Sequence, residues 1–218
     1  MISYERIRND ESVVAYIKAA DASLASLGYT EHSFAHVVKV AEDSAALLTA
    51  LGYDAHTVEL ARIAGILHDI GNVVNRSGHS QSGALMAFRL LDKMGMEPEN
   101  IAAVVTAIGN HDEGDGVPVS DIAAALIIAD KSDVRRSRVR SSREQFDIHD
   151  RVNYSVTDSR LALTEDGRRV ELILDIDTAI SPVMEYFEIF LGRMLLCRKA
   201  ADRLGVEFGL VINSQKII

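Results

Sequence analysis

The chain has 218 residues, of which 48% are hydrophobic and 25% charged, a composition that excludes disordered and low-complexity proteins. No apolar run reaches the ~18 residues of a membrane span, and the N-terminal residues lack the apolar core of a secretory signal. Cys197 is the single cysteine, so an internal disulfide is excluded and a reducing cytoplasm is the expected location. The net charge of −9 argues against nucleic acid and membrane surfaces as partners.

Six helices are predicted in the first part of the chain, because apolar residues recur there at helical spacing. Glycines follow several of these segments, and Ser120 precedes the last of them as a capping residue. The predicted helices span residues 10–27, 33–51, 57–70, 80–94, 98–109 and 122–132. Since the links between them are short, residues 1–150 are expected to form one all-α helical bundle.

After about residue 150 the pattern changes to alternating, β-rich segments. Residues 152–163 and 168–176 are predicted strands, and Glu165-Asp166-Gly167 between them is a hairpin signal. Pro182 then opens an amphipathic helix to residue 204, and residues 208–212 form a last predicted strand. The sequence therefore predicts a small α+β subdomain of order β-β-α-β over residues 151–218. The apolar face of its helix is broad enough to cover the sheet and to contact a second subunit, so a homodimer is expected and this part is assigned a regulatory or dimerisation role.

Ionisable side chains at successive helix ends are the candidates for chemistry. A histidine at a helix end is commonly a cap or a surface residue, but His68 and Asp69 end an almost wholly apolar helix, and Asp130 follows another apolar run. Ionisable groups are rarely buried without a partner or a metal. Imidazole and carboxylate together suit Fe, Mn, Co, Ni or Zn, and the lack of cysteine partners argues against a structural zinc cage. The candidates are His36, His68, Asp69, His79, His111 and Asp130.

The order of four of these residues resembles a known family. His36, then His68-Asp69, then Asp130 is similar to the H…HD…D signature of the HD-domain metal-dependent phosphohydrolases. The segments HSFAHVVKVAEDSAALL, ARIAGILHDIGN and AAALIIADKSD match that family as well, and the resemblance covers roughly residues 30–135. It implies an all-α HD domain whose helices direct the four side chains at one metal.

The resemblance also gives a meaning to the two remaining candidates. Members with two metals have two more histidines between the HD pair and the last aspartate, and His79 and His111 lie in these intervals. The implied site is dinuclear with Asp69 bridging the metals; the alternative is one metal, with His79 and His111 only polar neighbours of the pocket. The implied cofactor is one or two divalent ions, from Fe, Mn, Co, Ni, Zn or Mg. The implied ligand sets are His36, His68, Asp69 and Asp130 for one metal and Asp69, His79 and His111 for the other.

The activity that the resemblance implies is hydrolysis of a phosphate ester or phosphoanhydride of a nucleotide-like small molecule. A bound metal lowers the pKa of its water from ~15.7 toward ~7, which provides hydroxide near neutral pH. Asp69 and Lys131 are the predicted catalytic residues. Lys131 and Arg135 are predicted substrate ligands, because cations bind phosphate oxygens; the alternative is a surface pair or a salt bridge to Asp133.

These two cations belong to a basic segment that ends at Arg143 and holds six basic residues and one acid. The segment is a candidate site for a phosphorylated ligand, and its alternatives are a solvated helix end or a subunit contact. An RNA-binding adaptor that uses these arginines is disfavoured, because the rest of the chain is acidic and would repel a nucleic acid backbone. A second interpretation of the whole chain is a ligand sensor or regulatory protein that keeps the HD fold and a metal with little or no turnover.

The residues after His111 indicate which group within the HD family this sequence resembles most. They resemble the HHExxDGxGYP segment of cyclic-dinucleotide phosphodiesterases only in part, since Asp112 replaces the second histidine and Asn72 stands where those enzymes have lysine. The compact helical domain is more similar to the HD hydrolases of diadenosine tetraphosphate and similar nucleotides. The other histidines are assigned no ligand role: His32, His56 and His149.

Overall fold

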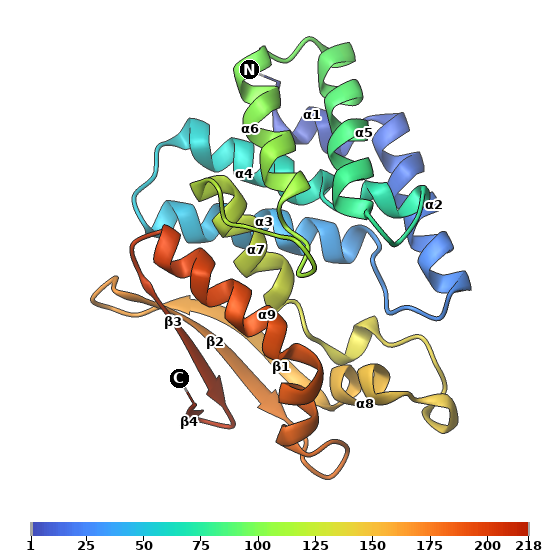
Figure 1. Ribbon diagram of the computed structural model, residues 1–218, viewed down its shortest axis with the longest axis vertical. Helices are drawn as coiled ribbons and strands as arrows, with labels where there is room; N and C mark the ends of the chain where they lie inside the picture. The colour runs from blue at the N-terminus through green and yellow to red at the C-terminus, as the bar shows by residue number, and fades with distance from the viewer. Residues whose placement is uncertain (1, 218) are drawn as a thin grey trace.

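Within residues 2–217, which the computed structural model describes, seven α-helices form the part of the fold drawn in the upper half of Figure 1. Short 3₁₀ helices follow α4 and α7, at Ile70–Val73, Arg136–Arg138 and Arg143–Gln145. The α-helices are α1 (Tyr4–Arg8), α2 (Glu11–Ser26), α3 (Phe34–Ala50), α4 (Ala55–Leu67), α5 (His79–Met94), α6 (Pro98–Gly109) and α7 (Asp121–Ser132). None of the helices in this range combines the length and the hydropathy needed to cross a bilayer.

Local sequence determines where the helices of this part begin and end. Ser33 caps α3 and Ser120 caps α7, each by accepting a hydrogen bond from a nearby backbone amide. After α4 the chain tightens into the 3₁₀ helix that contains Gly71. A Cβ at Gly71 would lie 2.0 Å from the carbonyl oxygen of His79, so only glycine lets this turn lie against α5. The end of α4 and the start of α5 are therefore held together.

A four-stranded sheet and two helices complete the fold (Figure 1). The sheet has the order β1-β2-β3-β4, with β1 and β2 antiparallel, β2 and β3 parallel, and β3 and β4 antiparallel. Val170, Leu172 and Leu174 alternate with more exposed residues along β2, so one face of the sheet packs on the core. The elements are α8 (Ile148–Ser155), β1 (Val156–Leu163), β2 (Arg169–Ile176), α9 (Val183–Arg203), β3 (Glu207–Ile212) and β4 (Gln215–Lys216).

Helix α7 is the centre of the packing. It contacts α3, α4 and α6 in the helical part and α9 and β1 in the C-terminal part. Its residues from Ile122 to Ala129 are all buried, which explains why this segment is apolar on every side. Helix α9 contributes Tyr186, Phe190 and Cys197 to the same core. The C-terminal part is thus placed against the helix that carries Asp130.

The predicted helices and the order β-β-α-β, found as β1–β2–α9–β3, are present, with shifted ends. The predicted strand from Val152 is wrong for residues 152–155, which form the last turn of α8. Asp147 caps this helix by accepting a hydrogen bond from the amide of Asp150, and Val152 is buried, so capping and packing override the local β preference. Helix α1 and strand β4 were not predicted. The predicted domain boundary after residue 150 falls within α8, and the division itself stays a prediction.

Candidate metal centre

His36 enters the centre from the first turn of α3, where its ring is buried. Its Nδ1 lies 2.7 Å from a carboxylate oxygen of Asp133, which accepts the ring N–H. Burial would raise the pKa of Asp133, but the hydrogen bond from His36 and the charge of Arg138 hold that pKa well below its usual range. The ionised Asp133 therefore keeps a proton of His36 on Nδ1 and turns Nε2 toward the centre, where it could bind a cation.

Three more histidines lie at helix ends and share one local geometry. Each ring places Nδ1 against the backbone carbonyl oxygen of the residue three positions earlier. A carbonyl oxygen can only accept, so Nδ1 carries a proton and Nε2 is the ring atom that faces the centre and could bind a cation. The distances from Nδ1 to oxygen are 2.7 Å for His68 to Gly65, 3.1 Å for His79 to Arg76 and 2.6 Å for His111 to Ile108.

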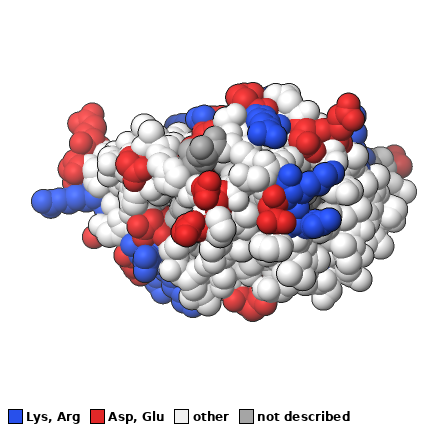
Figure 2. Space-filling view, turned by 90° about the horizontal axis from the view of Figure 1, so that it is seen from above, with Lys and Arg blue, Asp and Glu red and all other residues white. Residues whose placement is uncertain are grey.

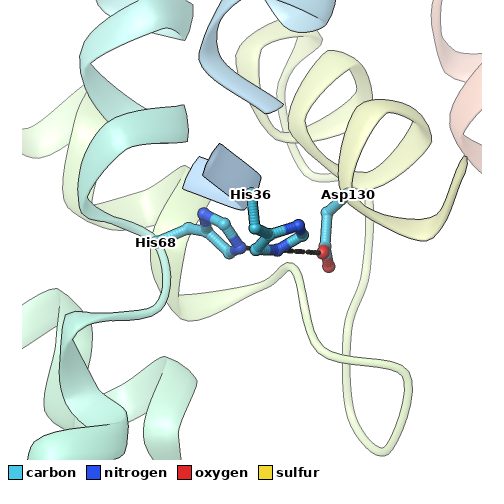
Figure 3. A group of neighbouring side chains, drawn as sticks. All are labelled: His36, His68 and Asp130. Atoms are coloured by element: carbon cyan, nitrogen blue, oxygen red, sulfur yellow. Dashed lines mark ion pairs between the residues drawn. The ribbon is translucent and has the colours of Figure 1, made fainter. Parts of the chain in front are cut away.

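Two of the Nε2 atoms meet both aspartates of the centre. Nε2 of His36 lies 3.3 Å from Oδ1 of Asp130 and 3.5 Å from Oδ2 of Asp69. Nε2 of His68 lies 3.6 and 3.4 Å from the same two oxygen atoms. Figure 3 shows how His36, His68 and Asp130 point toward one another from α3, the end of α4 and α7. The ligand atoms of these three residues lie within 4.8 Å of one another, as do those of His68, Asp69 and His111.

The other two Nε2 atoms meet on the opposite side of Asp69. Nε2 of His79 lies 3.5 Å from Oδ1 of Asp69 and 3.2 Å from Nε2 of His111. Burial lowers the pKa of both histidines, so the rings are neutral and their two lone pairs face each other. Lone pairs this close repel unless a cation lies between them. Asp69 presents Oδ2 to His36 and His68 and Oδ1 to His79, so its carboxylate would be able to hold a cation on either side.

The electrostatics of the centre favour a cation. Burial would raise the pKa of Asp69 and of Asp130, but His68 holds the first and Lys131 the second well below the usual value. Burial would also lower the pKa of His68, yet Asp69 and Asp130 raise it to about 10. Two ionised carboxylates thus stabilise positive charge at the position where the histidines converge.

The donor set fits a divalent metal ion. Nε2 of His36 and Nε2 of His68 are buried, and neither has a hydrogen-bond partner within residues 2–217. Buried polar atoms are rarely left unpaired, and one cation would satisfy both of these. Imidazole and carboxylate ligands without cysteine suit Fe, Mn, Co, Ni or Zn.

A cavity of about 410 Å³ opens directly onto the two aspartates. Its walls come from both parts of the fold, because α8 contributes His149, Asp150 and Asn153 and α9 contributes Phe190 and Arg193. The sequence had given His149 no function, and the structure places it in this wall. The helical part contributes Leu27, Gly28, Tyr29, Thr30, His32, Asp69, Arg76, His79, Glu113, Asp130, Lys131 and Arg138, and Asp147 completes the lining.

The two predicted substrate ligands lie in different places. Lys131 is buried and lines the cavity, with Nζ 2.7 Å from Oδ2 of Asp130 and 3.5 Å from Oε2 of Glu113. Arg135 is not among the described residues that line the cavity, and its Nε lies 2.7 Å from Oδ1 of Asp133. The structure thus brings the six predicted metal ligands and Lys131 together, and it places Arg135 behind Asp133, in the salt bridge that was its alternative.

The other arginines of the basic segment are used inside the molecule. Arg138 donates to the backbone carbonyls of Glu31 and Asp133. Arg136 and Arg143 lie over the ring of Tyr154, at 4.6 and 4.9 Å from its centroid. Arg140 is ion-paired with Asp21. These contacts attach the segment after α7 to α2 and α8, so its charges serve the fold.

Sequence reasoning missed three residues that contact the centre. Asn72 is buried and donates to Oδ1 of Asp69 at 2.8 Å, Arg76 lies beside His79, and Asp133 holds His36. Asn72 follows the HD pair at the position where a departure from the family pattern had been noted, which was the available signal. Nothing in a single sequence places Asp133 against a residue 97 positions away.

The comparison with protein families is decisive for the helical part. Residues 33–136 match the family model described as HD domain, and this range includes the six predicted ligands. Residues 33–136 of this chain are an HD domain. The resemblance inferred from the spacing of His36, His68-Asp69 and Asp130 is therefore confirmed.

Individual relatives are about a quarter identical to this HD protein over the aligned residues. An uncharacterized protein of Methanocaldococcus jannaschii is 24% identical over 210 residues, which cover 84% of this chain and 80% of that protein. Ribonuclease Y of Cutibacterium acnes is 27% identical and that of Thermus thermophilus 29% identical, each over 67% of this chain. The match covers only 27% and 25% of these two ribonucleases. A solved structure of a predicted HD superfamily hydrolase from an uncultured Thermotogales bacterium is 25% identical, with a TM-score of 0.47 over 60% of this chain and 71% of that one.

Proposed function

We propose that this HD protein is a metal-dependent phosphohydrolase that cleaves a phosphate ester or phosphoanhydride of a nucleotide-sized small molecule. The observation that carries the proposal is the convergence of four Nε2 atoms on two ionised aspartates at one end of a cavity. A divalent metal held there supplies an activated water and neutralises phosphoryl charge. The ligands would be His36, His68, Asp69 and Asp130 on one side and Asp69, His79 and His111 on the other.

The protein groups around the ligands support hydrolysis of this kind. In the reaction the oxygen of water bonds to phosphorus, the ester P–O bond breaks, and one proton of the water ends on the leaving alcohol. Burial would lower the pKa of Lys131, but Asp130 raises it, so the ammonium keeps its charge at the cavity wall, where it would face a bound phosphate. A fixed positive charge in a buried site stabilises the charge that develops on phosphoryl oxygens.

The cavity supports a small substrate. Its volume of about 410 Å³ lies within the ~300–1,000 Å³ of pockets that enclose small molecules. On the face shown in Figure 2, Lys and Arg groups lie beside Asp and Glu groups and form no continuous basic tract among the described residues. A polymer that is bound through its backbone needs such a tract. The name of the two ribonuclease relatives suggests cleavage of RNA instead, so the experiment below includes an RNA substrate to distinguish the two activities.

The first experiment measures metal content and hydrolysis on the same samples. Protein purified without chelators is analysed for bound Fe, Mn, Co, Ni and Zn, and is then offered nucleoside mono- and polyphosphates, p-nitrophenyl phosphate and a short RNA. We expect two metal equivalents per chain, release of phosphate from the small substrates and an intact RNA. Asp69→Asn should lose both metal and activity, because it removes the charge of the bridging carboxylate.

Asp43→Asn is the matched control for this variant. Asp43 lies on α3, half-buried and 2.7 Å from Nζ of Lys39, and it is not a ligand candidate. It should keep its metal and full activity. Bound metal without turnover of any substrate would contradict the proposal and favour the ligand sensor, and an active Asp69→Asn would show that the site is assigned wrongly.

A further inference from the structure

Arg76 extends into the metal centre from the turn that precedes α5. Its Nη1 lies 3.4 Å from Nε2 of His79 and 3.4 Å from Oδ1 of Asn72, and the side chain lines the cavity beside Asp69 and Asp130. The guanidinium is therefore next to the atoms that would bind the metals.

Arg76 differs from the other cations of the cavity in having no acidic partner. Lys131 lies 2.7 Å from Asp130, Arg193 lies 3.0 Å from Glu113, and Arg138 lies 3.6 Å from Asp133. No carboxylate of residues 2–217 lies within 4.0 Å of the Arg76 guanidinium. A cation that lines a cavity without a carboxylate partner remains available for an anion from outside.

The position of Arg76 is set by two neighbours. Asn72 is buried and uses Nδ2 to donate to Asp69 and Oδ1 to accept from Arg76, so one side chain orients both the bridging carboxylate and the guanidinium. The guanidinium also lies over the ring of Tyr29, 5.8 Å from its centroid, and Tyr29 itself lines the cavity. Arginine held in this way keeps its N–H groups directed at one place, which reduces the entropy lost when it binds a planar or tetrahedral anion.

We propose that Arg76 binds a terminal oxygen of the substrate's phosphate and thereby selects phosphomonoesters. This inference rests on the proposed function, since it concerns the group that the metal centre would cleave. A phosphomonoester has three terminal oxygens and up to two negative charges, whereas a diester has two such oxygens and one charge. Cations held on the two sides of Asp69 would accommodate two oxygens, and Arg76, beside His79, would bind the third, which a diester lacks.

The test compares Arg76→Gln with wild type in metal-loaded protein. Steady-state kinetics are measured with p-nitrophenyl phosphate and with bis(p-nitrophenyl) phosphate, and the dissociation constant of inorganic phosphate is measured by calorimetry. A hydrogen bond to a charged group is worth enough to change affinity by about tenfold to a hundredfold. We expect that increase in KM for the monoester and in the phosphate dissociation constant, with a smaller effect on kcat, little change for the diester and unchanged metal content. Arg76→Lys, which keeps the charge, should recover part of the loss.

Arg62→Gln is the matched control. Arg62 also lies over a tyrosine ring, 5.4 Å from the centroid of Tyr4, but it is ion-paired with Glu42 and Glu59 and is not among the described residues that line the cavity. It should change neither KM nor phosphate binding. An equal loss for monoester and diester in Arg76→Gln, or wild-type protein that prefers the diester, would overturn the inference.

The phosphate measurement separates this inference from the proposed function. If wild type hydrolyses nothing, the proposed function fails; phosphate binding that still depends on Arg76 then supports the anion site alone. If wild type hydrolyses p-nitrophenyl phosphate and Arg76→Gln binds phosphate equally well, the inference is wrong and the proposed function stands.

Discussion

At the scale of single residues, Asp133 shows how a side chain outside the ligand set controls the centre. It is buried, accepts the Nδ1 proton of His36 at 2.7 Å, and is held in turn by Arg135 at 2.7 Å. Such outer carboxylates fix the tautomer and orientation of a ligating histidine. We predict that Asp133→Asn weakens metal binding by about 10–100-fold, measured by titration with a competing chelator.

Two measurements keep that prediction distinct from a loss of folding. Asn has the shape of Asp and can still accept a hydrogen bond, so Asp133→Asn is expected to fold. The melting temperature of the metal-free variant checks this. Asp43→Asn again serves as the control with unchanged affinity. Wild-type metal affinity in a folded Asp133→Asn protein would show that His36 does not depend on this contact.

Cys197 supports a second prediction at this scale. It is buried in α9, and burial raises the pKa of its thiol to about 12 from the ordinary value of 9.0. Because the thiolate is the reactive form, the native protein at pH 8 should react with a thiol reagent about a thousandfold more slowly than the unfolded chain. Labelling with Ellman's reagent, with and without guanidinium chloride, measures this ratio. Rapid labelling of the native protein would contradict it.

Ligands and their supporting residues differ in how far the sequence predicts them. His68, Asp69 and Asp130 stand out because they lie at the ends of apolar helices, and ionisable groups buried there need a partner. Asn72 and Arg76 have no such pattern, since a polar residue in a loop after a helix is ordinary. Their roles depend on the turn that places them beside Asp69 and His79, which only the three-dimensional arrangement shows.

At the scale of elements, the junction of α4 and α5 determines the second half of the centre. Gly71 packs so closely on α5 that an added Cβ would lie 2.0 Å from the carbonyl oxygen of His79 and 2.4 Å from the amide nitrogen of Gly83. Both contacts are with backbone, so α5 has to move. We predict that Gly71→Ala lowers the free energy of unfolding by about 1–3 kcal/mol and lowers metal content, because His79 moves with α5.

Gly109 offers the matched control for this substitution. It lies at the end of α6, two residues before His111, and an added Cβ would meet Ala84 at an ordinary 3.7 Å. Gly109→Ala should therefore keep the metal and leave stability unchanged or raise it by up to about 1 kcal/mol. Denaturation with urea and metal analysis of both variants test the pair. Equal behaviour of the two would show that the close packing at Gly71 is not required.

The elements themselves were predictable where one periodicity dominates. The apolar run of α7 and the Pro98 start of α6 are local signals, and both helices begin within a residue of the predicted position. Residues 152–155 were predicted wrongly because their β preference is local, whereas the cap at Asp147 and the burial of Val152 depend on the fold. The order of strands and the position of α8 at the cavity also depend on tertiary packing.

At the scale of the whole molecule, helix α9 has two faces with different surroundings. One face of α9 packs on α7 and carries Phe190 and Arg193 to the cavity wall. The other face exposes Met184, Leu191 and Leu195 at 74%, 51% and 42%. Exposed apolar side chains aligned on one helix face are typical of a contact with another molecule.

The sequence of this exposed face fits a second copy of the same chain. In an antiparallel pair of α9 helices related by a two-fold axis, setting Leu191 of each copy against Leu195 of the other also sets Glu188 against Arg198. Glu188 and Arg198 are both exposed, and neither forms an ion pair within residues 2–217. The same register thus matches apolar with apolar and acid with base, so the homodimer expected from the sequence is predicted to form through α9.

Charge exchange tests this dimer without removing apolar surface. Light scattering over a range of concentrations should give a dimer for wild type. Glu188→Lys should give a monomer, because the new lysine then faces Arg198 at both symmetry-related contacts of the interface. Glu188→Lys combined with Arg198→Glu should give a dimer again, because opposite charges face each other once more. Leu191→Glu with Leu195→Glu should also give a monomer that keeps its metal, since neither side chain lines the cavity. A monomeric wild type at all concentrations would exclude the dimer. If wild type is a dimer and the double charge variant is a monomer, the dimer forms in a register other than the one that sets Glu188 against Arg198.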